Sequence, residues 1–145
     1  MLKRMQISAN GLVQGVGFRP YIYNLATKLS LSGFVQNNTS GIFIDVEGCD
    51  NAVNEFLACL VESPPPHAII EDIQYTTLQP KGYKDFIIEE SALKENNTTM
   101  ICADNTTCPD CLKELFDPMD LRYRYPFINC TNCGPRFTIV KDIPY

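Results

Sequence analysis

The sequence lacks the features that would mark it as membrane-bound, secreted or nucleic-acid-binding. No apolar run approaches the roughly 20 residues of a membrane span, and the N-terminal MLKRMQISANG has no signal-peptide hydrophobic core. With 12 Lys and Arg against 17 Asp and Glu, the net charge of −5 provides no cationic field for a nucleic acid. These absences predict a cytoplasmic protein with neither a membrane nor a nucleic-acid partner.

An obvious catalytic base is missing as well. The only histidine, His67, follows three prolines, so we expect it to be a loop residue. The composition of the 145-residue chain, 45% hydrophobic and 20% charged, is that of a folded globular protein. This length allows one ordinary domain, or one small domain with a satellite module.

Two stretches carry apolar residues at the spacing of one helix face. In the first, Pro20 suits the opening turn of a helix because its missing N–H costs nothing there. In the second, Asp50 is a suitable N-cap, and the three prolines at 64–66 end the helix. The apolar stripes predicted to face the core are Ile22, Leu25, Ala26 and Leu29, then Val53, Phe56, Leu57 and Leu60.

Alternating apolar residues predict strands around these helices. The segment 37–41, NNTSG, has strong turn chemistry and lies between two of them. The predicted strands are 5–9, 34–36, 42–47, 69–77 and 86–89. The resulting β-α-β-β-α-β order is typical of the ferredoxin-like α+β fold, an antiparallel sheet with both helices on one face.

The helical and strand periodicity stops near residue 91. Residues 92–107, ALKENNTTMICADNTT, are rich in Asn and Thr and are predicted to form a linker. A second, smaller module then begins near Cys108, so we predict three parts with bounds 1–91, 92–107 and 108–145. The expected core of the small module is Leu115, Phe116, Tyr123, Tyr125 and Phe127.

The stretch VQGVGFRP at 13–20 contains no Ser, Cys, His or acidic residue. It joins a predicted strand to a helix N-terminus, whose N–H groups and dipole favour an anion. Gly15 and Gly17 allow the backbone to curl around a guest, and Arg19 offers a planar fork for two phosphate oxygens. A phosphate or acyl phosphate is the natural guest, and a plain strand–helix turn with a surface arginine is the alternative.

Four of the seven cysteines form two C-x2-C pairs separated by 18 residues, a spacing typical of zinc sites. Two such knuckles place four thiolates on one tetrahedral zinc, and the closed shell indicates a structural role. These four are Cys108, Cys111, Cys130 and Cys133. Free thiols or a redox pair are the alternatives. The remaining cysteines lack such spacing and are predicted to be spare or buried thiols: Cys49, Cys59 and Cys102.

GLVQGVGFRP followed by GFVQNNTSG resembles the acylphosphatase signature, over roughly residues 4–91. The resemblance implies that Arg19 binds the phosphoryl oxygens and that Asn37 positions the attacking water. It also implies that a row of backbone amides cradles the phosphate: Gly15, Val16, Gly17, Phe18 and Arg19. Without the family, Asn37 is better interpreted as a turn residue.

The segment TCPDCLKELFDPMDLRYRYPFINCTNCGPRFTI closely resembles the first zinc finger of the HypF-type hydrogenase maturation carbamoyltransferases. In that family the acylphosphatase-like domain hydrolyses carbamoyl phosphate. The carbamate is then adenylated with ATP in a later domain and passed to the C-terminal cysteine of HypE, on the way to the cyanide ligands of NiFe hydrogenase. The resemblance implies carbamoyl phosphate and structural zinc for this chain. It places ATP and HypE with downstream domains, so we expect a truncated N-terminal piece.

Two other hypotheses remain open at this point. The first is an inactive module, whose loop still holds phosphate and whose finger serves as a docking surface. The second is a regulatory finger that binds nucleic acid, which the near-neutral charge of the second module disfavours.

Overall fold

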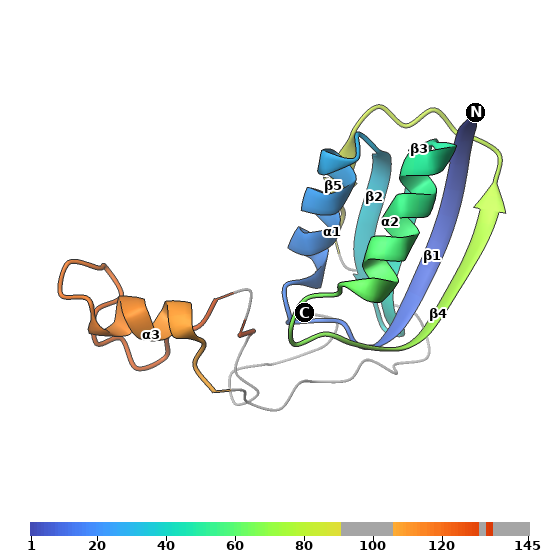
Figure 1. Cartoon of the computed structure of the whole chain (residues 1–145). Helices are drawn as coiled ribbons and strands as arrows, with labels where there is room; N and C mark the ends of the chain where they lie inside the picture. Colours follow the sequence, from blue (N-terminus) through green and yellow to red (C-terminus); the bar gives the residue numbers. More distant parts are fainter. Residues whose placement is uncertain (91–105, 131–132, 135–145) are drawn as a thin grey trace.

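A sheet of five strands carries two helices on one of its faces (Figure 1). The computed structural model describes residues 1–90, 106–130 and 133–134, so nearly all of the predicted linker at 92–107 lies outside the described residues. The elements in chain order are β1 Leu2–Leu12, α1 Phe18–Lys28, β2 Ser32–Asn38, β3 Gly41–Cys49, α2 Asp50–Glu62, β4 Ile69–Leu78, β5 Phe86–Ile88 and α3 Pro109–Phe116.

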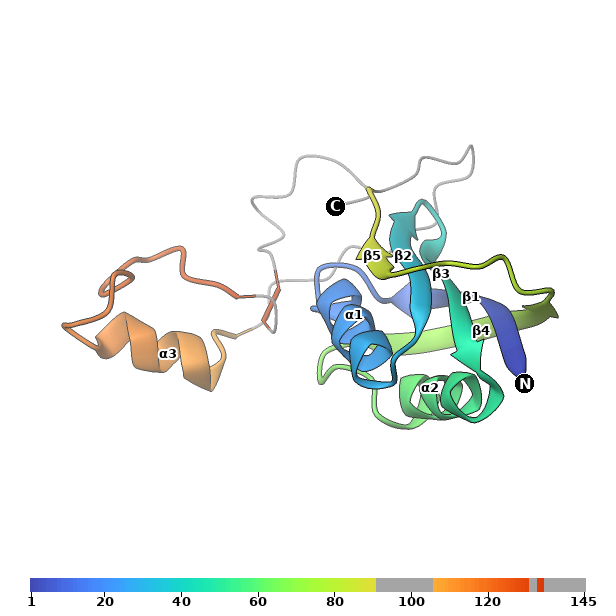
Figure 2. The same ribbon diagram turned by 90° about the horizontal axis from the view of Figure 1, so that it is seen from above.

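The strands lie in the order β4-β1-β3-β2-β5. All neighbours are antiparallel except β5, which runs parallel to β2 at the edge of the sheet. Seen from above, α1 and α2 lie side by side against the same face (Figure 2). The predicted β-α-β-β-α-β order and the ferredoxin-like α+β class are therefore confirmed, and the predicted short strand at 86–89 forms β5 at the edge.

The core lies between the sheet and the two helices. On β1 the alternating residues Met5, Ile7 and Ala9 are at most 2% exposed, because successive strand side chains point to opposite faces. The predicted helix stripes meet them, and their most buried members have no exposed surface: Ile22, Ala26, Val53, Phe56 and Leu60. Since these stripes come from both helices, both are fixed to one face of the sheet.

The opposite face of the sheet is held by polar contacts. The carboxylate of Asp45 on β3 accepts hydrogen bonds from Arg4 Nε at 2.8 Å and from Gln6 Nε2 at 2.8 Å. The hydroxyl of Tyr83 also donates to Asp45, at 3.2 Å, and the Arg4 guanidinium lies 5.6 Å from the centre of the Tyr83 ring. The segment before β5 thus covers the ion pair, and the Asp45 side chain is only 1% exposed.

Two local expectations were wrong. Cys49, not Asp50, is the N-cap of α2, because β3 continues through Cys49, which pairs with Leu2 of β1. The turn expected at 37–41 is shorter, because Asn37 and Asn38 belong to β2 and pair with β3. Asn37 therefore has its position set by the sheet.

In the described part of the small module lies one helix, α3, with Cys108 as its N-cap and Pro109 at its first position. Its buried residues are Cys108, Cys111, Ile128 and Cys133, with Leu115 and Cys130 packed against them. The predicted aromatic core was wrong for four residues, which are 43–72% exposed: Phe116, Tyr123, Tyr125 and Phe127. Among the described residues this module has no second layer to cover those rings, so the cysteines take the place of an apolar core.

Candidate functional site

The loop between β1 and α1 curls its backbone around a pocket. Gly15 and Gly17 adopt positive φ angles of 70° and 75°, which glycine reaches without a Cβ penalty. Gly17 is also the N-cap of α1, and no side chain caps this helix. The first N–H groups of α1 therefore lack intrahelical acceptors, and the positive end of the helix dipole lies beside the loop.

Gln14 fixes this loop to the neighbouring strands, and the sequence analysis missed it. Its side chain is 1% exposed, and its Nε2 donates to the carbonyl oxygens of Asn38 at 2.7 Å and Gly41 at 2.8 Å. Both acceptors flank the β2–β3 turn, next to Asn37. The sequence did offer a signal for this role, because Gln14 is a long amide side chain among glycine and apolar residues.

Arg19 and Asn37 line the same pocket, of about 320 Å³. The rest of its lining comes from the loop and from the second module: Val13, Gln14, Gly15, Gly17, Phe18, Pro20, Asn129, Cys130 and Gly134. Asn37 is 2% exposed and lies on the helix side of β2 with Val35. Two residues far apart in sequence therefore line one cavity, while the roles that the resemblance implies for them stay predictions.

Arg19 is half-buried at the start of α1. Burial lowers the pKa of its guanidinium, although an arginine remains charged in any case. Within the described parts of the chain, no carboxylate forms an ion pair with Arg19. The pocket thus contains one positive charge whose natural complement is an anion.

The other two predicted loop residues differ in where their side chains lie. Phe18 lines the pocket, yet it is 2% exposed and packs edge-on against Tyr21 at a centroid distance of 6.1 Å. Val16 is 1% exposed and belongs to the apolar core rather than to the pocket lining. Its side chain anchors the loop, and the part its backbone amide plays stays a prediction.

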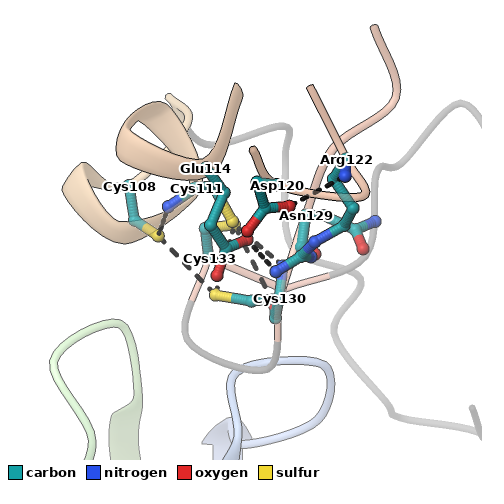
Figure 3. Close-up of polar contacts among 8 residues, drawn as sticks. All are labelled: Cys108, Cys111, Glu114, Asp120, Arg122, Asn129, Cys130 and Cys133. Atoms are coloured by element: carbon teal, nitrogen blue, oxygen red, sulfur yellow. Dashed lines mark hydrogen bonds and ion pairs between the residues drawn. The ribbon is translucent and has the colours of Figure 1, made fainter. Parts of the chain in front are cut away.

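The four paired cysteines converge on one point. Their sulfurs all lie within 4.8 Å of one another. The Sγ–Sγ distance is 3.6 Å between Cys108 and Cys130 and 3.9 Å between Cys111 and Cys133 (Figure 3). A tetrahedral shell with metal–sulfur bonds of about 2.3 Å has sulfurs about 3.8 Å apart. The residues present therefore fit a four-thiolate metal site.

Backbone N–H groups point at two of these sulfurs. Cys111 N donates to Cys108 Sγ at 3.5 Å, and Cys130 N donates to Cys133 Sγ at 3.3 Å. Burial alone raises the pKa of the Cys133 thiol, but the N–H donors outweigh it and lower that pKa to about 7. Burial raises the pKa of Cys111, with its thiol neighbours adding to the effect. The directions differ because backbone N–H groups stabilise the Cys133 thiolate, whereas burial and the neighbouring thiols disfavour the Cys111 thiolate.

Arg122 connects α3 to the second knuckle, and the sequence analysis gave it no such part. Its Nη2 pairs with the carboxylate of Glu114 on α3, and its Nη1 donates to the carbonyl oxygen of Asn129 at 2.9 Å (Figure 3). Its backbone N–H also donates to Asp120 Oδ1 at 2.8 Å. Asn129, which lines the pocket, is thereby held against the helix that begins at the first knuckle.

The pocket lies at the glycine loop between β1 and α1, and a four-cysteine module follows the sheet. Together these features define an acylphosphatase-like domain with an attached finger. The sequence matches the acylphosphatase family over residues 5–88 and the HypF finger over residues 107–140, and the chain belongs to the acylphosphatase family. It is 37% identical over 89 residues to the acylphosphatase of Thermotoga maritima, covering 61% of this chain and 98% of that protein.

Over its whole length the chain is similar to HypF carbamoyltransferases. It is 43% identical over 145 residues to carbamoyltransferase HypF of Synechocystis sp., covering 100% of this chain and 19% of that protein. A crystal structure of full-length HypF in a phosphate- and nucleotide-bound form superposes with a TM-score of 0.94 at 48% identity, covering 100% of this chain and 19% of that one. The chain thus spans about a fifth of the length of these relatives. No helix in the described residues is long and apolar enough to cross a membrane.

Proposed function

We propose that this chain hydrolyses acyl phosphates in the pocket between the loop at 13–20 and Asn37, and that carbamoyl phosphate is its substrate. The observation that carries this proposal is that Arg19 and Asn37 line one cavity with the loop backbone. The family supports the reaction type, and the HypF relatives support the carbamoyl group. The HypF structure determined with phosphate bound agrees with a phosphate guest.

In this mechanism the phosphoryl oxygens lie against the loop amides and the Arg19 guanidinium. Asn37 holds a water in line with the bond to be broken, since an amide can both donate and accept. The water oxygen bonds to phosphorus as the bond from phosphorus to the acyl oxygen breaks. The products are inorganic phosphate, which takes up the proton of the water, and carbamate.

This chemistry needs no strong base. The leaving group is a carbamate anion, which departs without being protonated. Phosphoryl transfer depends mainly on positioning and on charge stabilisation in the transition state. A fixed guanidinium and preorganised N–H groups are suited to both tasks, which agrees with the absence of acid, His, Ser and Cys from residues 13–20.

The larger context follows from the family. We propose that the carbamate is consumed in the cytoplasm during hydrogenase maturation, through ATP-dependent adenylation and transfer to a HypE-type partner. Those two steps belong to parts of the longer relatives outside these 145 residues. Nothing in the described pocket is assigned to ATP or to HypE.

We propose zinc as the metal held by Cys108, Cys111, Cys130 and Cys133. Four thiolates at tetrahedral spacing fill its coordination shell, so it would supply folding energy and no reactive water. The chain should contain about one zinc, as measured by metal analysis. A chain purified at neutral pH with all four thiols freely titratable and no metal would contradict this assignment.

The test of the activity is phosphate release from carbamoyl phosphate by the zinc-loaded chain, with Arg19→Ala and Asn37→Ala beside it. Removal of one preorganised group that stabilises transition-state charge typically costs about 100- to 1000-fold in kcat, and we expect that range for both variants. Arg124→Ala and Asn51→Ala are matched controls, because both residues are exposed and lie outside the pocket lining.

Each outcome separates the hypotheses. Loss of turnover in the two pocket variants alone, with circular dichroism unchanged, supports the assigned roles. Turnover that survives Arg19→Ala contradicts the part given to Arg19. Binding of inorganic phosphate with no turnover of carbamoyl phosphate by the unmutated chain would instead favour the inactive binding module.

A further inference from the structure

The pocket is not built by the acylphosphatase-like domain alone. Three residues of the second module belong to its lining, namely Asn129, Cys130 and Gly134. Cys130 is one of the four converging cysteines, and the other two flank the second knuckle. The candidate metal centre and the candidate phosphate pocket therefore share a boundary.

The contact between the two modules is a backbone contact. Gly134 has a φ of 73°, and a Cβ placed on it would lie 2.0 Å from the carbonyl oxygen of Gly15. No side chain fits there, so the two main chains meet at Gly15, the first glycine of the loop. A glycine at 134 is required both by the backbone conformation and by the space.

On the finger side of the pocket, Gly134 and Asn129 are both held by hydrogen bonds within the finger. Gly134 directly follows Cys133, and its N–H donates to the carbonyl oxygen of Cys130 at 2.8 Å. Asn129 is held by Arg122, as described above. The position of this pocket wall is consequently set by the backbone of the second knuckle and by the Arg122 side chain.

We propose that the finger forms the wall of the pocket that faces the acyl group and limits the site to small acyl phosphates. This inference rests on the proposed function. In the proposed mechanism the loop, Arg19 and Asn37 surround the phosphate, so the rest of the lining, which includes the finger residues, is left to border the acyl group. Because main-chain atoms at Gly134 and Gly15 cannot rotate away as a side chain can, this wall should favour a carbamoyl or acetyl group over a bulkier benzoyl group.

Binding of stable phosphonate analogues tests this wall without any turnover. The zinc-loaded chain should bind acetylphosphonate about tenfold or more tightly than benzoylphosphonate, as measured by calorimetry, since a shaped pocket discriminates by about 10- to 200-fold per misfit group. Gly134→Ala should remove most of that preference while retaining about one zinc per chain. Gly82→Ala is the matched control, because Gly82 has a similar φ of 84° with nothing within 4 Å of its would-be Cβ.

A second measurement needs no variant. In the unmutated chain, titration with acetylphosphonate should shift the amide NMR signals of Asn129 and Gly134 together with those of Gly15 and Gly17. Shifts confined to the loop would overturn the proposal, as would a Gly134→Ala chain that keeps both its zinc and the full preference. Because neither readout involves hydrolysis, an inactive chain that shows the preference would contradict the proposed activity and leave the wall intact.

Discussion

The acylphosphatase-like domain buries a continuous apolar core, drawn from both helices and from four of its five strands. The finger buries Ile128 and three cysteines, while its aromatic rings lie at the surface. The first region excludes water with side chains such as Phe56 and Ile44, each fully buried. The second has too few layers to do this, so sulfur atoms that converge on one point replace the core.

This difference shows what each region depends on. Hydrophobic burial is distributed over many residues, so a single change weakens it by a few kcal/mol. A metal cluster concentrates its free energy in four atoms, and zinc-finger peptides gain about 10–16 kcal/mol from their metal at neutral pH. Loss of one ligand cysteine should therefore unfold the finger, whereas a single substitution in the domain should only lower its free energy of unfolding.

Cys130→Ser should give the largest effect, because a hydroxyl is a poor ligand where a thiolate is required. We expect the zinc content to fall from about one per chain to nearly none. Amide hydrogen exchange should then show loss of protection across α3, while α1 and α2 keep theirs. A finger that loses its metal but keeps α3 protected would mean that Ile128 and Leu115 suffice as a core.

The features that sequence could predict are those encoded by local spacing. The helix stripes, the strand alternation, the glycine loop and the two C-x2-C pairs all repeat over a few residues, and the structure contains each of them. Asn37 was predicted through the family only, because its own neighbours, Asn38 and Thr39, favour a turn equally well. Its place in β2 follows from its pairing with Ile42 of β3, and no local sequence pattern predicts that pairing.

The features that sequence missed depend on distant partners. Gln14 bonds to carbonyl groups 24 and 27 residues away. No local pattern marks Arg122, because its bonds to Glu114 and Asn129 form only once the finger is folded. The expected aromatic core failed because an apolar residue is buried only where a second layer exists to cover it.

Asp45→Asn tests how far one substitution lowers the free energy of unfolding of the domain, and we expect an effect of intermediate size. Removing one partner of a buried ion pair costs about 3–5 kcal/mol, and we expect the lower end because the Arg4 side chain is 14% exposed. Urea unfolding followed at α1 and α2 measures this loss. Asp85→Asn is the control, since Asp85 is exposed and forms no ion pair among the described residues.

The pH dependence of the same variant has a defined sign. Burial raises the pKa of Asp45, but hydrogen bonds from Arg4 and Gln6 outweigh it, so the folded pKa lies below the usual value. A carboxyl with a lowered folded pKa stabilises the fold above its unfolded pKa of about 3.9 and loses that contribution as the pH falls further. The unmutated domain should therefore lose stability more steeply below about pH 4 than Asp45→Asn does. Equal slopes would show that Arg4 and Asp45 are not coupled.

Cys49→Ser should give the smallest effect, with the opposite sign to the same substitution at Cys130. Cys49 is the exposed N-cap of α2, with φ −62° and ψ 139°, and no side chain caps that helix. Serine is a preferred N-cap whose hydroxyl accepts from the first turn, worth about 0.5–1 kcal/mol, or about 2–6 °C in Tm for a domain of this size. Zinc content should not change, because Cys49 lies outside the four-cysteine cluster. A fall in zinc or in Tm would mean that the domain, like the finger, depends on a thiol.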